Sequence, residues 1–355
     1  MINKSSKYGL PKKVEFCSKC VMSNQKPNSS IEFTSSNSKN KVGINIEKNI
    51  CDACKYNDIK NEIDWEKREK ELLKLLDKYR NKSGAYDVVV PGSGGKDSAY
   101  TSHILKYKYG MNPLTVTWAP HLFTDIGTQN FNNWMRIGGL DNLLFTPNGL
   151  LHKRLTSLAF QNLLHPFQPF IIGQKLIAPK IAKKFNIPLI MYGENQAEYG
   201  NKINENYIPK MDESFFSVKK KKSIFLGGVS LEELLKTDKF KVNQYDSYIP
   251  FGTEILREKK IEFHYLGYYL KWDPQECYYY SYEKTGFSPN VERTQGSYSK
   301  YSSIDDKIDY FHYYTTLIKF GIGRTTYDAS QEIRNNKITR DEGVTLVKKF
   351  DQEFP

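Results

Sequence analysis

Short apolar runs alternate with amphipathic segments through the middle of the chain. Ala85–Val90, Leu114–Trp118 and Ile187–Tyr192 are rich in β-branched and large apolar residues, as in strands that are buried on both faces of a parallel sheet. The segments between them have helical periodicity, over Ala99–Tyr109, Thr128–Ile137 and Phe170–Phe185, the last with an interruption at Pro179. Because strands and helices alternate, the pattern predicts an α/β fold with a parallel sheet and right-handed crossovers.

The regions on either side of this core have different patterns. Glu62–Asn81 is strongly charged with a helical apolar stripe, which predicts a connector helix. From about 201 to 260 the composition shifts to Lys, Asp, Ser and Phe, with a basic run at Lys219–Lys222, and this favours an insertion or lobe. Ile261–Trp272 returns to strand character, and helices are expected over Ile304–Phe320 and onward to Phe350. We therefore predict an N-terminal ribbon-like module, a connector helix, an α/β core, a lobe and a C-terminal strand and helical region, at residues 1–61, 62–82, 83–200, 201–260 and 261–355.

Four of the five cysteines lie in the first 54 residues, as the pairs Cys17-Ser-Lys-Cys20 and Cys51-Asp-Ala-Cys54. Each Cys-x-x-Cys turn offers two thiolates, and two such turns can supply a tetrahedral metal site. The segment between the pairs is rich in Ser, Asn and Lys and can bury little apolar surface, so a metal would organise it. We predict structural zinc (Zn²⁺) on these four cysteines, with disulfides as the alternative. Four thiolates leave no position for water, so the zinc is not expected to take part in catalysis.

The first strand leads into a glycine-rich loop, Pro91-Gly92-Ser93-Gly94-Gly95-Lys96-Asp97-Ser98. Its glycines allow a sharp turn that presents N–H groups to an anion, and the following helix adds its positive N-terminal end. Ser93 and Ser98 can donate hydrogen bonds and Lys96 adds a positive charge, whereas Asp97 would meet phosphate through Mg²⁺. The spacing differs from a Walker A loop and from the Gly-x-Gly-x-x-Gly of dinucleotide-binding folds.

The chain is basic, with 52 Lys and Arg against 40 Asp and Glu, a net charge of +12. Such an excess favours polyanionic ligands such as nucleotides, phosphosugars, nucleic acid or a membrane surface, although the lysine usage of an AT-rich genome would give the same excess. The sequence has no apolar run of about 18 or more residues and no apolar segment after its polar N-terminus. We therefore expect a cytoplasmic protein that does not span the membrane.

The glycine-rich loop, placed between a strand and a helix, resembles that of the PP-loop ATP pyrophosphatases, the superfamily of GMP synthetase and asparagine synthetase. Further motifs follow in order, namely Tyr192-Gly-Glu-Asn195-x-x-Glu198-Tyr-Gly200, Leu270-Lys-Trp-Asp273, Gly296-Ser-Tyr-Ser299, Lys319-Phe-Gly-Ile-Gly-Arg324, Asp328 and Glu332-Ile-Arg334. With the cysteine pairs they resemble, almost end to end, the N-acetyl sugar amidotransferases of surface-polysaccharide and nonulosonic-acid biosynthesis. One departure is Ser297, where threonine would be expected. That family uses ATP and ammonia to convert an acetamido group into an acetamidino group.

The resemblance implies a role for each motif. The loop from Pro91 to Ser98 would bind ATP together with Gly193 and Lys319, and the adenine would lie against Thr117 and Trp118. The residues implied in catalysis are Lys96, Asp97, Glu194 and Arg324. Mg²⁺ would bind to Asp97 first, with Glu194 and Glu198 as the next candidates. The sugar would be held by Glu194, Asn195, Asp273, Tyr298, Arg324 and Asp328.

Simpler interpretations exist for several of these residues. Trp118 could be an ordinary core residue, and Glu194 and Glu198 could be surface carboxylates. Lys319 and Arg324 could belong to a solvated helix end. Cys277 lies in a tyrosine-rich stretch and is expected to be a packed core thiol.

The resemblance also implies a partner, a separate class I glutaminase subunit that supplies ammonia, with the ribbon as one candidate docking surface. The expected substrate is an N-acetylated sugar that is linked to a nucleotide. Two other functions stay open. A tRNA-thiolating enzyme would explain the ribbon, the PP-loop and the basic charge, but only Cys277 follows the loop and no Arg-rich stripe is present, so nucleic acid is not the expected partner. A nucleotide-binding sensor would not need the downstream carboxylates and arginine.

Overall fold

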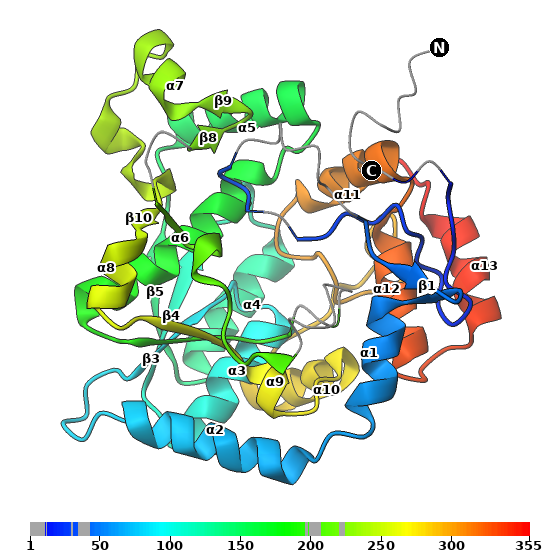
Figure 1. Cartoon of the computed structure of the whole chain (residues 1–355), viewed down its shortest axis with the longest axis horizontal. Coiled ribbons are helices and arrows are strands. Elements are labelled where there is room, and N and C mark those ends of the chain that lie inside the picture. The colour runs from blue at the N-terminus through cyan, green and yellow to red at the C-terminus, as the bar shows by residue number, and fades with distance from the viewer. Residues whose placement is uncertain are drawn as a thin grey trace.

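The computed structural model describes residues 11, 13–29, 31–34, 43–195, 198, 207–219 and 224–355. Its centre is a five-stranded parallel sheet in the order β11-β6-β3-β4-β5 (Figure 1). β3 (Val88–Pro91), β4 (Pro113–Trp118) and β6 (Leu189–Tyr192) are the three strands that the apolar runs predict. β5 (Asp141–Phe145) and β11 (Glu262–Tyr265) complete the sheet at its two edges. The predicted α/β class with a parallel sheet is confirmed.

Four helices connect the strands of the core: α3 (Lys96–Tyr107), α4 (Asp125–Arg136), α5 (Gly149–Leu163) and α6 (Gln168–Phe185). The chain runs from β3 outward to β4 and β5, and then returns to place β6 on the other side of β3. Right-handed crossovers therefore place α3 and α6 on opposite faces of the sheet, and the direction of winding reverses between β3 and β6. The carboxyl ends of the strands at such a reversal are where α/β sheets bind ligands.

The helix α6 continues through Pro179, where the sequence favoured an interruption. β5 and α5 were not expected from the sequence. The residues of β5 are exposed or half-buried throughout, so this edge strand lacks the apolar run that marks β3, β4 and β6.

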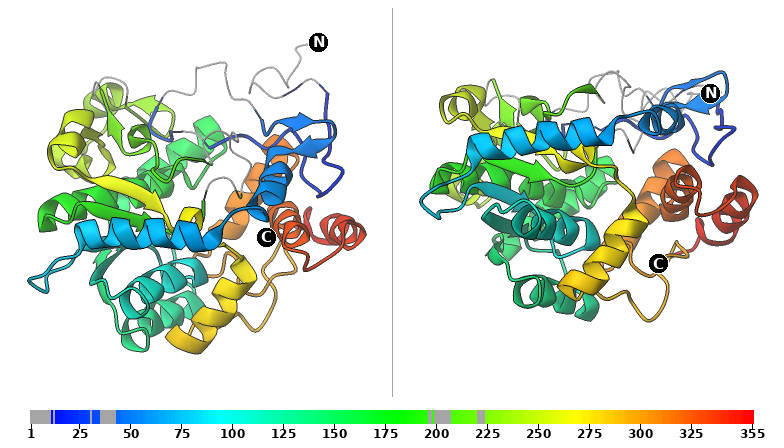
Figure 2. Two further views of the ribbon diagram at one scale, coloured as in Figure 1. Left: turned by 60° about the horizontal axis from the view of Figure 1, so that its bottom comes forward. Right: turned by 90° about the horizontal axis from the view of Figure 1, so that it is seen from below.

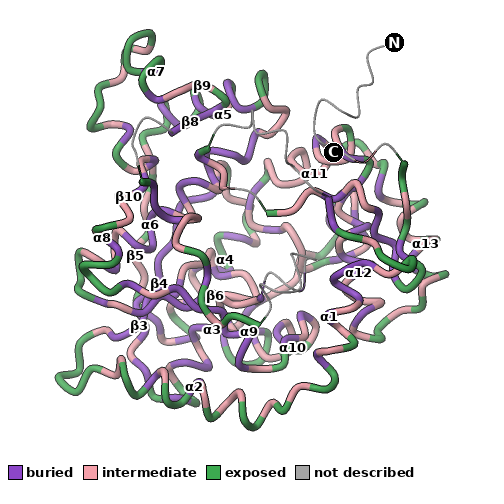
Figure 3. Tube along the Cα trace, viewed as in Figure 1, coloured by how far each residue is buried: buried purple, intermediate pink, exposed green. Residues whose placement is uncertain are grey.

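The connector region forms α2 (Trp65–Tyr79), which follows α1 (Asp52–Lys60) and lies along the outside of the molecule (Figure 2). Asp64 caps α2 by accepting a hydrogen bond of 3.0 Å from the Lys67 amide. Leu72 and Leu76 are buried, and much of the rest of the helix is exposed, as Figure 3 shows. The helix contacts α9 (Leu266–Tyr269), so it is fixed to the segment that follows β11.

The region from 201 to 260 contributes no strand to the central sheet among its described residues. It contains the paired strands β7 (Ser217–Val218) and β10 (Phe251–Gly252) and the hairpin of β8 (Phe225–Leu226) and β9 (Val229–Ser230). Its helices are α7 (Leu231–Thr237), α8 (Thr253–Glu258) and the 3₁₀ turns Glu213–Phe215, Val242–Gln244 and Asp246–Tyr248. Three lysines of the predicted basic run, at 220–222, lie outside the described residues.

The C-terminal region is mostly helical, with α10 (Pro274–Thr285), α11 (Asp309–Phe320), α12 (Arg324–Arg334) and α13 (Arg340–Phe350). The strand expected over Ile261–Trp272 ends at Tyr265, where the chain turns into α9. The helix expected from Ile304 begins at Asp309, because Asp306 forms a β-bridge with Phe123. No helix in the described part of the chain has the length and apolar character needed to cross a bilayer.

The N-terminal module packs on the C-terminal helices (Figure 2). It contains the two-residue strands β1 (Ile46–Glu47) and β2 (Ile50–Cys51), followed by α1. Its apolar residues Met22 and Ile44 join Ile322, just before α12, in one small core around the cysteines. The Arg340 guanidinium, at the start of α13, donates hydrogen bonds to the carbonyls of Cys17 and Cys20, at 3.4 and 3.3 Å.

The packing of α6 on β4 gives a stability prediction. A Cβ atom at Gly173 would lie 2.2 Å from Cε2 of Trp118, so alanine at this helix position cannot be accommodated without movement. We expect Gly173→Ala to lower the free energy of unfolding by about 1–3 kcal/mol in urea denaturation, as overpacking does. Gly149→Ala, at the first residue of α5 with no atom within 4 Å of the new Cβ, is the control and should lose no stability. Equal stability of the two variants would contradict this account of the core.

Candidate active site

The glycine-rich loop Pro91–Ser98, called the PP-loop below, joins β3 to α3 at the reversal point of the sheet. A Cβ atom at Gly92 would lie 2.1 Å from Cβ of Ser98, and Gly94 has a φ of +84° with Phe131 Cα 2.8 Å from its Cβ position. Both positions therefore need glycine. Gly95 is the N-cap of α3 and offers no capping side chain, so no side-chain cap occupies the amides of the first turn. A helix start of this kind can bind phosphate.

Lys96 and Asp97 form an ion pair at the start of α3, with 2.5 Å between Lys96 Nζ and Asp97 Oδ2. Burial lowers the pKa of Lys96, but Asp97 and then Glu194 outweigh it, so the pKa lies above its usual value and the ammonium stays charged. The other oxygen, Asp97 Oδ1, is buried and has no hydrogen-bond partner among the described residues. A carboxylate oxygen of this kind fits Mg²⁺, which binds through one or two carboxylates and completes its shell with phosphate oxygens and waters.

A cavity of about 260 Å³ opens beside this ion pair. Its walls come from five parts of the chain: the start of α3, the end of β6, the start of α10, the loop before α11 with α12, and the N-terminal module. Of the residues predicted for catalysis or for the sugar, the cavity brings together Lys96, Asp97, Glu194, Asp273, Arg324 and Asp328. These residues are spread over more than half of the sequence, and they meet where the fold places a ligand.

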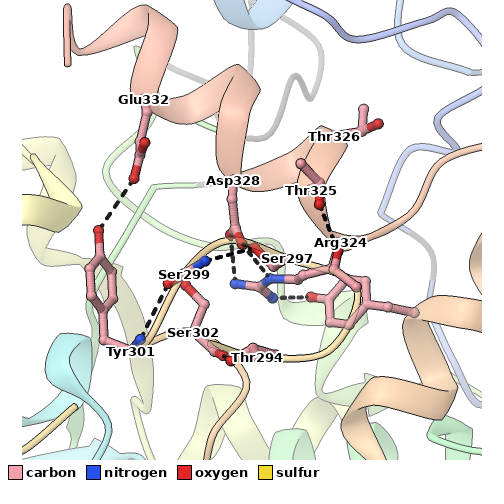
Figure 4. A network of polar contacts seen from close by, with 12 residues as sticks. Thr294, Ser297, Ser299, Tyr301, Ser302, Arg324, Thr325, Thr326, Asp328 and Glu332 are labelled. Atoms are coloured by element: carbon pink, nitrogen blue, oxygen red, sulfur yellow. Dashed lines mark hydrogen bonds and ion pairs between the residues drawn. The ribbon is translucent and has the colours of Figure 1, made fainter. Parts of the chain in front are cut away.

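Arg324 and Asp328 lie one turn apart on α12 and form a bidentate ion pair, 2.9 and 3.2 Å long (Figure 4). The Arg324 guanidinium also donates a 2.7 Å hydrogen bond to the Tyr313 hydroxyl. Ser297 donates a 2.5 Å hydrogen bond to Asp328, so the loop before α11 is tied to α12. The arrangement fixes Arg324 at one wall of the cavity, with its charge partly balanced.

Tyr298 and Glu332 continue this network. The Tyr298 hydroxyl donates a 2.7 Å hydrogen bond to Glu332, and Tyr301 lies 3.5 Å from the other carboxylate oxygen. Glu332 and Tyr301 line the cavity, whereas Tyr298 supports Glu332 from behind. Burial raises the pKa of Glu332, although the hydrogen bond from Tyr298 offsets part of that effect.

Asp273 lines the cavity, and the predicted residues Gly193 and Asn195 flank Glu194, which also lines it. Asp273 is the N-cap of α10, accepts a 2.9 Å hydrogen bond from the Gln275 amide and lies 3.4 Å from the Lys337 ammonium. At Gly193 a Cβ atom would lie 2.9 Å from Trp272, so glycine allows the end of β6 to approach this ring. Asn195, two residues after Gly193, is buried. The rest of the predicted motif, at 196, 197, 199 and 200, lies outside the described residues.

The structure gives Thr117 and Trp118 core positions in place of the predicted contact with adenine. Trp118 is 1% exposed, stacks on Phe145 with 5.0 Å between ring centroids and meets Tyr248 edge-on. The Thr117 hydroxyl accepts a 2.9 Å hydrogen bond from Asn142 of β5. Both side chains are thus engaged between β4 and its neighbours, and neither lines the cavity.

Lys319 and Glu198 are also engaged elsewhere. The Lys319 ammonium donates a 3.0 Å hydrogen bond to the carbonyl of Leu163, the last residue of α5, and does not line the cavity where ATP phosphates were expected. The Glu198 carboxylate forms a 2.7 Å ion pair with the Lys60 ammonium of α1, and both side chains are 2% exposed. The carboxylate that was predicted to bind Mg²⁺ is therefore already paired with an ammonium group, which argues against that role.

Sequence reasoning missed several residues of the cavity. Met22, Lys26, Ile44 and Ala53 come from the N-terminal module, and Gln331 comes from α12. The module was expected to be a separate unit or a docking surface, so nothing in its sequence assigned it to a cavity wall. Arg334 belongs to the motif Glu332-Ile-Arg334, but the sequence analysis predicted no role for it.

Two half-buried carboxylates lie beyond the cavity residues, Asp305 in the loop before α11 and Asp309 at the first position of α11. Burial raises the pKa of Asp305, and a hydrogen bond with Ser93 offsets part of this rise. Burial likewise raises the pKa of Asp309 to about 7, with Arg324 opposing it. Ser98 donates a 3.0 Å hydrogen bond to the Gly95 carbonyl. Ser98 therefore bonds within the PP-loop, whereas Ser93 ties the loop to Asp305.

The four cysteines predicted to bind zinc come together in one buried cluster. Sγ of Cys17 lies 3.7 Å from Sγ of Cys54, and Sγ of Cys20 lies 3.7 Å from Sγ of Cys51. All four sulfurs lie within 4.8 Å of one another and none forms a disulfide. Four sulfurs at about 2.3 Å from a tetrahedral Zn²⁺ would be about 3.8 Å apart, so the cluster fits zinc. The amides of Lys19, Cys20 and Cys51 point to Sγ of Cys17 at 3.4–3.5 Å, which suits a thiolate.

Residues 295–355 match the family model described as the C-terminal domain of WbpG-like lipopolysaccharide (LPS) biosynthesis proteins. The match covers the loop before α11 and the helices α11, α12 and α13, and hence one wall of the cavity. The C-terminal part of the chain is thus similar to that of WbpG-like proteins. The parallel sheet agrees with the fold expected from the PP-loop motif, and the matched segment contains the later motifs from Gly296 to Arg334.

Other similarities are partial. The chain is 39% identical over 80 residues to MJ1599, an uncharacterized protein of Methanocaldococcus jannaschii, and this stretch is 22% of the chain and 28% of that protein. The NMN synthetase of Francisella tularensis is similar at 11% identity and a TM-score of 0.33, over 82% of this chain and 98% of that one. The NH₃-dependent NAD synthetase of Campylobacter jejuni is similar at 16% identity and a TM-score of 0.28, over 36% and 56%.

The buried ion pair between Lys60 and Glu198 gives a second stability prediction. Lys60→Met removes the ammonium and leaves the Glu198 carboxylate buried without its partner. Breaking a buried pair from one side costs about 3–5 kcal/mol, and we expect a loss of this size in urea denaturation. Lys236→Met is the control, because Lys236 pairs with Glu232 and both side chains are about two-thirds exposed, and such pairs contribute at most about 1 kcal/mol. If both variants lost the same free energy of unfolding, the buried pair of Lys60 and Glu198 would be no more stabilising than a surface pair.

The cysteine cluster predicts the metal content of the protein. We expect about one zinc per chain by elemental mass spectrometry, and loss of that zinc with faster proteolysis of the N-terminal module in Cys51→Ser. Cys277→Ser is the matched control, because Cys277 is a buried cysteine outside the cluster, and should keep its zinc. Protein without metal that keeps a protease-resistant module would refute the metal assignment.

Proposed function

We propose that this protein is an ATP-dependent ligase of LPS biosynthesis that activates a sugar through the transfer of AMP. The observation that carries the proposal is the cavity, in which Lys96 and Asp97 of the PP-loop face Arg324, Asp328 and Glu332 of the WbpG-like domain. A phosphate-binding loop is thereby placed next to polar side chains that suit a hydroxylated ligand. The name of the matched family supplies the pathway.

More specifically, we propose that the protein replaces the acetamido oxygen of an N-acetylated sugar by ammonia. The amide oxygen attacks the α-phosphorus of ATP and pyrophosphate leaves. Ammonia then adds to the activated carbon, AMP leaves with the former amide oxygen, and a C=N bond takes the place of C=O. The activation is needed because an amide oxygen is a poor leaving group without it.

The side chains of the cavity support this chemistry in distinct ways. The amides at the start of α3 and the Lys96 ammonium would bind phosphate oxygens and stabilise the charge that develops on them. Asp97 would hold Mg²⁺, which neutralises phosphate charge when bound. Arg324, held by Asp328 and Tyr313, would present its guanidinium to the substrate. Asp273, Glu194 and Glu332 would accept hydrogen bonds from sugar hydroxyls or from ammonia.

Ammonia would come from a separate class I glutaminase subunit, with the N-terminal module as the proposed docking surface. Cys277 does not suit a glutaminase nucleophile. It is 2% exposed, and burial raises the pKa of its thiol well above the usual value, so the thiol stays protonated. The same property speaks against a cysteine-dependent tRNA thiolation.

The direct test is incubation of the purified protein with Mg-ATP, an ammonium salt and a panel of acetamido sugars, free and UDP- or CMP-linked. We expect sugar-dependent AMP and pyrophosphate, and a product in which NH has replaced one oxygen, by mass spectrometry. ADP and phosphate as products would refute the proposed use of the PP-loop.

The Asp97→Asn variant tests the proposed Mg²⁺ ligand. Removing one stabilising group from the reacting phosphates typically costs about 100-fold or more in rate, and we expect a loss of that size in AMP formation. Asp125→Asn is the matched control, because Asp125 also lies in the first turn of a helix, α4, but is exposed and away from the cavity. Unchanged AMP formation in Asp97→Asn would exclude Asp97 from the reaction.

A further inference from the structure

Glu332 on α12 differs from the other carboxylates of the cavity in what surrounds it. Three of the others are matched by cations, in the pairs Asp97–Lys96, Asp328–Arg324 and Asp273–Lys337. Glu194 acts on the ammonium that Asp97 binds, because it raises the pKa of Lys96. A cation stabilises the ionised form of a neighbouring carboxylate, so these four groups are weak proton acceptors.

The partners of Glu332 are hydroxyl groups. The Tyr298 hydroxyl donates a 2.7 Å hydrogen bond to Oε2, and the Tyr301 hydroxyl lies 3.5 Å from Oε1 (Figure 4). The Tyr301 hydroxyl also donates a 2.8 Å hydrogen bond to Oε1 of Gln275, which takes its one proton. The described part of the chain has no ion pair to Glu332. One carboxylate oxygen is therefore held by a strong donor, and the other keeps the capacity to accept a proton.

The ring of Tyr301 connects Glu332 to the PP-loop. Lys96 Nζ lies 5.9 Å from the centroid of this ring, and the hydroxyl at the other end of the ring faces Glu332. All three side chains line the cavity. A group that ATP activates beside Lys96 would therefore share the cavity with the Glu332 carboxylate.

The surroundings of Glu332 favour the protonated form. Burial raises the pKa of its carboxyl group, and the negative charges of Asp328 and Asp273 raise it further. The hydrogen bonds from Tyr298 and Tyr301 oppose this rise, but the pKa stays above its usual value. A carboxylate with a pKa moved toward neutrality is a better general base at neutral pH than one with an ordinary pKa.

The proposed reaction needs a proton acceptor at one step. When ammonia adds to the adenylated carbon, a C–N bond forms and the new nitrogen becomes positively charged. One proton has to leave this nitrogen before AMP departs, because the C–N bond otherwise breaks again. The C–O bond then breaks, the oxygen leaves with AMP, and the product is an amidinium cation. One proton is thus released in each turnover.

We propose that Glu332 is the proton acceptor of this step, and that its Oε1 takes one proton from the nitrogen of the added ammonia and passes it to solvent. Tyr298 is then a positioning residue, which holds Oε2 and leaves Oε1 for the incoming proton. The inference deepens the proposed function and rests on it, because it requires the reaction with ammonia.

The test measures activation and amination separately, with Mg-ATP and a panel of acetamido sugars, free and UDP- or CMP-linked. Exchange of labelled pyrophosphate into ATP reports activation, and the amidino product formed with ammonium chloride is measured by mass spectrometry. We expect Glu332→Gln to lower the rate of product formation about 100-fold or more, the usual contribution of a general base. Sugar-dependent exchange should be unchanged, which also verifies that the variant is folded.

Glu276→Gln is the matched control. Glu276 lies on α10 and pairs with Lys337, but its side chain is 66% exposed and does not line the cavity. This variant should keep both exchange and product formation.

The pH dependence distinguishes a proton acceptor from a structural role. At a fixed concentration of free ammonia, the wild-type rate should fall as the pH drops through the pKa of Glu332, since only the carboxylate accepts a proton. Tyr298→Phe removes a hydrogen bond that lowers this pKa, so the fall should shift to higher pH. Glu332→Gln should lack this dependence.

Hydroxylamine in place of ammonia gives an independent readout. Its oxygen withdraws electrons, so the nitrogen of its adduct is more acidic and loses its proton to water more readily. The rate deficit of Glu332→Gln should therefore shrink at least about tenfold, because a more acidic group depends less on a general base.

Equal rates of product formation in Glu332→Gln and the wild type would overturn the inference and leave the proposed function intact. Loss of exchange together with product would also overturn it, since Glu332 would then serve binding or folding. An unshifted pH profile in Tyr298→Phe would contradict it even if Glu332→Gln did not fold. A wild-type protein that exchanges pyrophosphate but makes no amidino product would refute the proposed reaction, and the inference with it.

Discussion

A single buried ammonium group holds together the parts of the chain that form the cavity. Lys60, the last residue of α1, pairs with Glu198 beyond β6 and also donates to the Trp272 carbonyl before α10. Arg334, the last residue of α12, donates to the carbonyl of the same Glu198, and Asn57 of α1 donates to the Arg334 carbonyl at 2.9 Å. The N-terminal module, the end of the sheet and the WbpG-like domain therefore meet at one point. A buried charge is costly unless it is fully partnered, so this contact favours one relative position of the three parts.

Different parts of the chain contribute different kinds of groups to this cavity. The sheet and α3 contribute the PP-loop, whose glycines and helix start suit phosphates and are common to many ATP-using folds. The WbpG-like domain contributes α12, whose side chains form two stripes, one of matched charges near the PP-loop and one facing the N-terminal module. Under the proposed function, activation of the substrate and its selection would fall to different parts of the chain. A change of substrate could be achieved on α12 and its facing module without altering the PP-loop.

The sequence predicted the features that depend on local pattern. Buried strands, the PP-loop and the spacing of the cysteines all have short-range signals, and the structure contains each of them. The predicted residues that do not line the cavity are those whose surroundings depend on tertiary packing. Thr117 and Trp118 were assigned to adenine from their place at a strand end, but burial against Phe145 and Asn142 determines their role. Lys319 and Glu198 were given roles because they belong to sequence motifs. In the structure Lys319 donates a hydrogen bond to the end of α5, and Glu198 pairs with Lys60. Lys26 and Gln331 had no local signal, because they become neighbours only when the module packs on α12.

The long separation between these parts has a consequence for the order of folding. Asn57 and Arg334 are 277 positions apart, and contacts of such separation form late because the entropy of closing a long loop opposes them. During synthesis the N-terminal module and the PP-loop leave the ribosome well before α12. A growing or truncated chain can therefore fold its PP-loop while the cavity wall formed by α12 is still missing. Under the proposed function, use of ATP would wait for completion of the chain, because the cavity that would admit an acceptor forms only after α12 has docked.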